Sequence, residues 1–250
     1  MGERDDSGDL AEPGGKLRLF VEDGLNAGDA VALTEGQAHY LRNVMRARSG
    51  DGVRLFNGRD GEWRATLDLS GKRRAGATPR SLARPQQDGP DLWLCFAPIK
   101  KTPADFIAQK ATELGVSVLK PVLTRRTIVN RVNTGRMRAN AIEAAEQSDR
   151  LDVPECHDPA ALPWLLAAWP AGRALLFCDE AGAPPALDAL KAAPRGPWAV
   201  LIGPEGGFDA EERAAIRALP QAVPATLGPR ILRADTAALA ALAIWQAVLG

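Results

Sequence analysis

Cysteine and histidine are scarce in this sequence, which has three cysteines and two histidines among 250 residues. Cys95, Cys156 and Cys178 lie far apart in apolar surroundings and form no cysteine–histidine ligand cluster, so buried thiols in a reducing cytoplasm are expected. Because His39 and His157 are the only histidines, a histidine-based zinc site or a Ser-His-Asp triad has few residues to build on.

Long apolar runs and an excess of one charge are also missing. No apolar stretch of about eighteen residues occurs, so no membrane span is expected. Met1–Lys16 is acidic and glycine-rich, which predicts a disordered leader and not a signal peptide. The formal net charge is zero, yet between Tyr40 and Gln86 eleven Arg or Lys outnumber four Asp or Glu. This local excess indicates a phosphate-facing surface.

Residues 17–85 have the pattern of a small β-barrel domain. Short apolar segments are separated by turns at Asn57-Gly58 and Asp60-Gly61. One helical stretch, Glu35–Arg46, places Ala38, Leu41, Val44 and Met45 on one face and Arg42 with Arg46 on another. Residues 80–90, which contain prolines, glutamines and a glycine, are expected to form a linker.

Residues 86–250 change to an α/β pattern. Apolar strands are predicted at 92–97, 116–123, 175–178, 199–202 and 222–227, with helical stretches between them. One helix should begin with Thr102 as its cap and end before Gly115, and another should span 134–148. The alternation predicts a parallel sheet with helices on both faces and a ligand site at the carboxyl ends of the strands.

Two glycine-containing loops follow predicted strands at that edge. Gly203–Gly207 runs into a helix capped by Asp209, with Glu212 at its third position. Gly228–Arg233 precedes Asp235, which is expected to cap a helix over 236–249. Each loop alone is also explained by a tight turn that binds no ligand. Together the loops can form one cleft, in which backbone groups bind an adenine edge between apolar walls.

These loops resemble the signature of the SPOUT-class small-subunit ribosomal RNA uracil-N3 methyltransferases. The similarity rests on Ile202–Gly207 and Leu227–Ala237. It extends to Thr112–Val116, to Glu143–Arg150 followed by Val153-Pro154, and to His39–Arg46 followed by Gly50-Asp51. The sequence departs from the family at Asp235, where a glutamate is usual, so the reach of that carboxylate differs by one methylene.

The resemblance implies an N-terminal PUA-like domain and a C-terminal domain with a deep trefoil knot, assembled as a homodimer in the cytoplasm. It implies S-adenosyl-L-methionine as cofactor and small-subunit ribosomal RNA, free or in the assembled subunit, as substrate. The apolar C-terminal helix fits either a dimer interface or a buried core helix. The expected cofactor-binding residues are Leu201, Ile202, Gly203, Pro204, Gly206, Gly207, Leu227, Gly228, Ile231 and Leu232.

Methylation at uracil N3 requires loss of the N3 proton and stabilisation of negative charge on the flanking carbonyl oxygens. Arg233 is the expected charge stabiliser, with a surface ion pair as the alternative. Asp235 or Glu205 is the expected proton acceptor, although Asp235 can equally serve as a helix cap.

Contacts to RNA are expected from basic side chains in both parts of the chain, each of which can also be a solvated charge. Glu146, Gln147 and Arg150 lie on one helical stretch and are added because they match the family; a structural polar network is the alternative for these three. The complete set of expected RNA contacts is Arg42, Arg46, Lys100, Lys101, Arg125, Arg126, Glu146, Gln147 and Arg150.

Three other functions remain open from the sequence. The chain can be a non-catalytic RNA-binding or ribosome-assembly protein, although two glycine loops on one cleft argue for a bound cofactor. It can also methylate another RNA position, including a ribose 2′-hydroxyl. A doubly wound oxidoreductase is disfavoured because the glycine fingerprint after the first strand and its acidic partner are missing.

Overall fold

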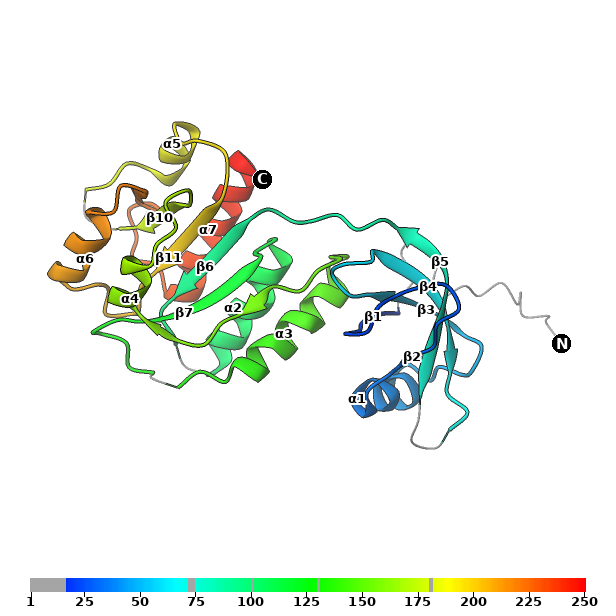
Figure 1. Ribbon diagram of the computed structural model, residues 1–250. Helices are drawn as coiled ribbons and strands as arrows, with labels where there is room; N and C mark the ends of the chain where they lie inside the picture. The colour runs from blue at the N-terminus through cyan, green and yellow to red at the C-terminus, as the bar shows by residue number, and fades with distance from the viewer. Residues whose placement is uncertain (1–16, 72–74, 100, 130, 180–181) are drawn as a thin grey trace. The chain divides into compact units, whose positions relative to one another are not determined.

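The computed structural model describes residues 17–71, 75–99, 101–129, 131–179 and 182–250 (Figure 1). The predicted leader, residues 1–16, lies outside the described residues. The chain divides into two compact units. The first unit runs to Asp88 and includes Ala145–Val153, and the second unit contains Gly89–Ala144 and Pro154–Gly250. No helix among the described residues is long and apolar enough to span a membrane.

The first unit is built on one five-stranded sheet with the order β1-β3-β4-β5-β2. The strands are β1 (Arg18–Phe20), β2 (Val31–Ala32), β3 (Gly52–Phe56), β4 (Glu62–Asp68) and β5 (Gly76–Arg84). Leu19, Leu41, Val53 and Leu55 are among the residues of its apolar core. β5 continues to Arg84 because it pairs with β4 through two register shifts, so the first half of the predicted linker is a strand.

The helical stretch of the first unit differs from its prediction. Thr34 and Gln37 form a capping box for α1 (Glu35–His39), which continues as the π-helical segment η1 (Tyr40–Val44). The wider π turn changes the angle between successive side chains, so Val44 is 61% exposed instead of facing the core. Arg46 lies beyond the helix with a φ of 55°, and the two arginines do not share a helical face.

A buried ionic cluster is the main polar feature of the first unit. The Glu62 carboxylate is fully buried and accepts hydrogen bonds from Arg18, Arg54 and Arg84 at 2.7 to 3.1 Å. Arg18 also donates to the carbonyl oxygens of Ala145, Glu146 and Arg150. Segment 145–153 therefore belongs to this unit although it is distant in sequence.

The second unit contains the predicted parallel sheet. Its strands are β6 (Leu92–Phe96), β7 (Val118–Leu123), β8 (Glu155–Cys156), β9 (Ala160–Ala161), β10 (Ala174–Cys178), β11 (Trp198–Ile202) and β12 (Ala222–Ala225). The order is β12-β10-β11-β6-β7-β8, with β9 also paired to β7, and all of these pairs are parallel. The predicted α/β class and parallel sheet are confirmed.

Helices cover both faces of this sheet (Figure 1). They are α2 (Lys101–Glu113), α3 (Thr134–Gln147), α4 (Leu162–Ala167), α5 (Ala186–Lys191), α6 (Ala210–Arg217) and α7 (Ala234–Leu249). Successive strand side chains alternate between two cores: Leu176 and Val200 pack with α2, α5 and α7, whereas Phe177 and Leu201 pack with α4 and α6. The alternation explains why these strands are apolar along their whole length.

The predicted first residue is wrong for two helices, α2 and α7. α2 already includes Lys101, so Thr102 is not its cap. α7 begins at Ala234 with Arg233 at the cap position, and Asp235 lies in the first turn. The predicted end of α2 is confirmed, since Gly115 has a φ of +82° and donates to the Thr112 carbonyl.

Candidate functional site

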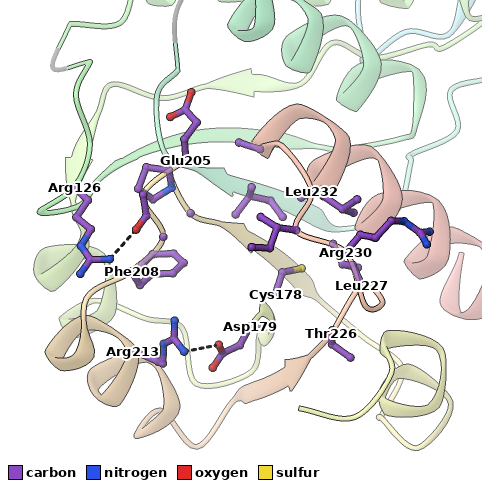
Figure 2. Close-up of a pocket in the computed structure, with 18 of the residues that line it drawn as sticks. Arg126, Cys178, Asp179, Glu205, Phe208, Arg213, Thr226, Leu227, Arg230 and Leu232 are labelled. Atoms are coloured by element: carbon purple, nitrogen blue, oxygen red, sulfur yellow. Dashed lines mark hydrogen bonds and ion pairs between the residues drawn. The ribbon is translucent and has the colours of Figure 1, made fainter. Parts of the chain in front are cut away.

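A cavity of about 330 Å³ opens at the carboxyl ends of β10, β11 and β12 in the second unit (Figure 2). Its walls come from Cys178-Asp179, from residues 202–208, from residues 226–232 and from the start of α7. Parallel strands direct their following loops to the same edge of a sheet, which brings these four segments together. The volume lies in the range of roughly 300 to 1,000 Å³ that is typical of small-molecule sites.

The first glycine loop is a tight turn between β11 and α6. Gly207 donates to the Pro204 carbonyl at 2.8 Å and has a φ of +66°, which favours glycine. A Cβ on Gly203 would lie 2.8 Å from the Phe208 ring, so a side chain there would displace that ring. The loop therefore needs glycine for two different physical reasons.

Asp209 ends this loop as the N-cap of α6. Its carboxylate accepts from the Glu212 N–H at 2.8 Å, and Glu212 accepts from the Asp209 N–H, so the predicted capping box is confirmed. The hydrogen bond from the Glu212 backbone is the largest cause that holds the pKa of Asp209 below its ordinary value. The carboxylate is thus ionised at the helix N-terminus, where negative charge is stabilising.

The second glycine loop follows β12. Gly228 has a φ of +115°, with open space where a Cβ would be, and its N–H lies 3.3 Å from the Thr226 hydroxyl. Leu227 and Leu232 add apolar wall to the cavity, whereas the Ile231 side chain is 83% exposed at its rim. The loop combines accessible backbone with apolar surface, as an adenine-like ring system requires.

A buried carboxylate at the end of β10 was missed by the sequence reasoning. Asp179 is 3% exposed, lines the cavity and binds Arg213 at 3.2 Å (Figure 2). It also binds Arg217 at 2.6 Å. Its position in the sequence could have identified Asp179 as a site residue, because Cys178-Asp179 lies at the end of a predicted strand, at the edge of the sheet where ligands bind. Arg213 also lines the cavity, but it comes from α6, and only the folded chain brings it there.

The comparisons with known proteins agree with this geometry. Residues 87–246 match the RNA methyltransferase domain family, and residues 33–75 match the RNA methyltransferase PUA domain. The ribosomal RNA small subunit methyltransferase E of Synechocystis sp. is 36% identical over 227 residues, which cover 88% of this chain and 73% of that protein. The chain belongs to the ribosomal RNA small subunit methyltransferase E family.

Other members of this methyltransferase E family match along nearly their full length. The Rickettsia conorii protein is 29% identical over 229 residues, 90% of this chain and 93% of its own. The crystal structure of the Neisseria gonorrhoeae enzyme, which is bound to S-adenosyl methionine, superposes with a TM-score of 0.84 at 29% identity. That superposition covers 93% of this chain and 98% of the other.

The structure brings most of the expected cofactor-binding residues of this methyltransferase E homologue together. Nine of the ten line the cavity, from Ile202 to Gly207 and from Leu227 to Leu232. Leu201 is fully buried in the core beneath and does not line it. Strand alternation explains the exception, because Leu201 and Ile202 point to opposite faces of the sheet.

The three expected catalytic residues are placed differently. Glu205 lies at the tip of the first turn and lines the cavity, where Figure 2 shows its carboxylate at the edge. Arg233 is exposed at the N-cap of α7 and is not among the lining residues. Asp235 accepts a hydrogen bond from the Thr236 N–H at 2.7 Å and also lies outside the lining set.

The expected RNA-contacting residues fall into separate places. Arg126 lines the cavity and Arg125 pairs with Asp209 and Glu211. Arg46 is exposed, whereas Arg42 donates to the carbonyls of Leu69 and Gly71 in its own unit.

The remaining expected RNA contacts lie on α3, in the segment after α3, or at the start of α2 and just before it. Glu146 accepts from the Phe20 N–H and Arg150 pairs with Asp152, so both belong to a polar network of the first unit. Gln147, the last residue of α3, is exposed. Lys100 lies outside the described residues, and of Lys101 the structure describes only the backbone, in α2.

The thiols fit a structural role. Burial is the largest cause that raises the pKa of Cys95 and of Cys178 to about 12, and that of Cys156 to about 11. These thiols stay protonated near neutral pH, as unreactive cysteines do. The expected burial is confirmed for Cys95, whereas Cys156 and Cys178 are half-buried and Cys178 lines the cavity. Among the described residues, no group of three or more His, Cys, Asp or Glu is arranged to hold a metal ion.

Proposed function

We propose that this protein transfers a methyl group from S-adenosylmethionine to N3 of a uridine in small-subunit ribosomal RNA. The observation that carries the proposal is the cavity between two glycine loops, in a chain of the methyltransferase E family. The relatives are named for activity on ribosomal RNA of the small subunit, and the Neisseria gonorrhoeae structure contains S-adenosyl methionine.

The residues that line the cavity fit this cofactor. Gly207 and Gly228 hold backbone in conformations that side chains would oppose, with no atom within 4 Å of either missing Cβ. Backbone N–H and C=O groups could therefore approach an adenine edge, and Leu227 and Leu232, which line the cavity, would supply apolar surface for its faces. When bound, S-adenosylmethionine supplies an electrophilic methyl group on its sulfonium.

The chain must then remove the N3 proton and stabilise the charge that develops on the uracil carbonyl oxygens. Glu205 is the proposed proton acceptor. The proposal is supported because Glu205 lines the cavity and its side chain makes no hydrogen bond or ion pair to another described residue. Asp235 already accepts the Thr236 N–H in the first turn of α7. Arg233, which has no ion-pair partner in the described part of the chain, is the proposed charge stabiliser.

The finer features of the family belong to the same proposal. We infer a homodimer, a trefoil knot in residues 86–250, and a cytoplasmic location where ribosomal subunits are assembled. α7 buries Ala238, Leu242 and Trp245 in the core of its own unit, and it presents a second, half-buried face that includes Leu239. Arg46 in the first unit and the basic rim of the cavity are the proposed contacts to RNA phosphates.

The test is transfer of labelled methyl from S-adenosylmethionine to unmodified small ribosomal subunits and to naked RNA. Nuclease digestion and mass spectrometry then identify the product nucleoside. Appearance of 3-methyluridine supports the proposal, whereas a 2′-O-methyl product assigns the enzyme to another RNA position. Absence of transfer by folded protein would favour the non-catalytic RNA-binding protein.

A further inference from the structure

We propose that Arg125 and Arg126 form a clasp that holds the first glycine loop in its cofactor-binding shape. The arginine clasp, as we call these two residues, follows β7 and reaches the loop that follows β11. The inference rests on the proposed function, because it assigns the two arginines as positioning residues for the cofactor. From the sequence, both residues were expected to contact RNA phosphates, with a solvated charge as the alternative.

Arg126 holds the tip of the glycine turn. Its Nη1 donates to the Gly206 carbonyl oxygen at 2.7 Å, as the dashed line in Figure 2 shows. The aliphatic part of its side chain packs against Gly206, since a Cβ at Gly206 would lie 3.5 Å from both Cβ and Cδ of Arg126. Arg126 therefore fixes the orientation of a peptide group in the loop and also contributes to the cavity wall.

Arg125 holds the other end of the same loop. Its backbone N–H donates to Glu212 Oε1 at 2.8 Å, and the opposite oxygen of Glu212 accepts from the Asp209 N–H. Its guanidinium binds Asp209 Oδ2 at 2.8 Å and Glu211 Oε2 at 2.5 Å. Both acidic groups raise the pKa of Arg125, with Glu211 the larger cause. The start of α6 is thus tied to the segment after β7 by backbone and side chain together.

The clasp has a physical consequence for binding. Residues 203–207 include three glycines, which lose more conformational entropy on ordering than other residues do. β11 fixes the loop at its start through the sheet, and the clasp fixes its tip and its end. A loop that is ordered before the cofactor arrives loses less entropy on binding, so its affinity is higher.

Cofactor affinity of the full-length protein tests the role of Arg126. We expect Arg126→Ala to raise the Kd for S-adenosylmethionine, measured by isothermal titration calorimetry, and its KM roughly tenfold. The kcat should change by about twofold or less, because Arg126 holds the loop and not the reacting atoms. Arg126→Lys retains a donor for the Gly206 carbonyl and should restore most of the affinity. Arg195→Ala, an exposed arginine outside this cavity, is the matched control and should bind like the wild type.

Salt distinguishes the two members of the clasp. Arg125 is 60% exposed and acts through ion pairs, so Arg125→Ala should weaken binding only a few-fold, and the difference from wild type should shrink at high salt. The loss in Arg126→Ala should persist, because its acceptor is a neutral carbonyl. The thermal melting temperature of each variant checks that it is folded.

Two results would overturn the clasp. One is wild-type affinity for S-adenosylmethionine in folded Arg126→Ala, particularly with weakened RNA binding, which would make Arg126 a phosphate contact only. The other is an Arg126→Lys variant as weak as Arg126→Ala. A wild-type protein that binds no S-adenosylmethionine would instead defeat the proposed function itself, so the two failures are distinguishable.

Discussion

In the first unit three arginines converge on one carboxylate, whereas in the second unit arginines line an open cavity. Arg18 and Arg54 are buried with Glu62, and their charges are compensated inside the unit. Arg126, Arg213 and Arg230 instead contribute to the walls of the cavity. Arginine therefore stabilises the fold where it is buried against Glu62, and it contributes to a binding site where it lines the cavity. Mutations at the Glu62 cluster should therefore lower stability, whereas mutations at the cavity should change cofactor binding or the reaction rate.

The largest effect should come from Glu62. In Glu62→Gln, Arg18 and Arg54 lose their shared buried carboxylate, and removal of one partner from a buried ion pair typically costs about 3 to 5 kcal/mol. We expect the free energy of unfolding, measured by urea denaturation, to fall by about that amount. The exposed Asp88→Asn is the control and should unfold like wild type. An unchanged urea midpoint in Glu62→Gln would remove the contrast between the units.

In the second unit, Arg233→Ala should affect the reaction and leave folding intact. Loss of a group that stabilises developing negative charge typically lowers kcat about 10²- to 10³-fold. The Kd for S-adenosylmethionine should stay within about twofold of wild type, since Arg233 does not line the cavity. Single-turnover methyl transfer and calorimetry measure the two quantities. If kcat is unaffected, Arg233 is a surface residue.

Glu205 and Asp235 can be ranked by parallel substitutions. A general base typically contributes about 10²-fold or more to the rate, so Glu205→Gln should lose at least that factor. Asp235→Asn should lose less than about tenfold, because the asparagine oxygen still accepts the Thr236 N–H. The pH dependence of kcat for each variant identifies the group that titrates. The reverse ranking would assign proton transfer to Asp235.

A smaller effect is expected from Gly203→Ala. The new methyl group would meet the Phe208 ring at 2.8 Å, and overpacking of this kind typically costs about 1 to 3 kcal/mol. We expect a roughly tenfold rise in the Kd for S-adenosylmethionine, with partial recovery when Phe208→Leu is added. Gly172→Ala has open space at its Cβ and is the matched control. Equal affinities in the two alanine variants would show that the ring moves freely.

The smallest effect is the acid sensitivity of the first unit. Burial alone would raise the pKa of Glu62, but hydrogen bonds from Arg84 and Arg18 outweigh it and lower the pKa below 4.5. A depressed folded pKa stabilises the protein above the unfolded value, and this contribution is lost as the pH falls through the folded pKa. Urea unfolding between about pH 3 and about pH 6 should show a steeper loss for wild type than for Glu62→Gln. Parallel curves would exclude Glu62 as the cause.

Local patterns in the sequence were sufficient for much of the second unit. Apolar runs such as Ala199–Ile202 predicted the strands, and Asp209 with Glu212 predicted the start of α6, because strand burial and helix capping depend on residues close together in the chain. The two glycine loops, together with the family resemblance that they carry, identified nine of the cavity residues.

Other features depend on segments that only the folded chain brings together. Neither the burial of Glu62 by three arginines nor the inclusion of residues 145–153 in the first unit follows from any local pattern, because the partners are up to 132 residues apart. The hydrogen bond from Arg126 to the Gly206 carbonyl also joins residues 80 positions apart and follows from no local pattern. A charged residue looks alike in sequence whether it is solvated, paired or lining a cavity. Its role is decided by the dielectric environment and the neighbours that tertiary packing supplies.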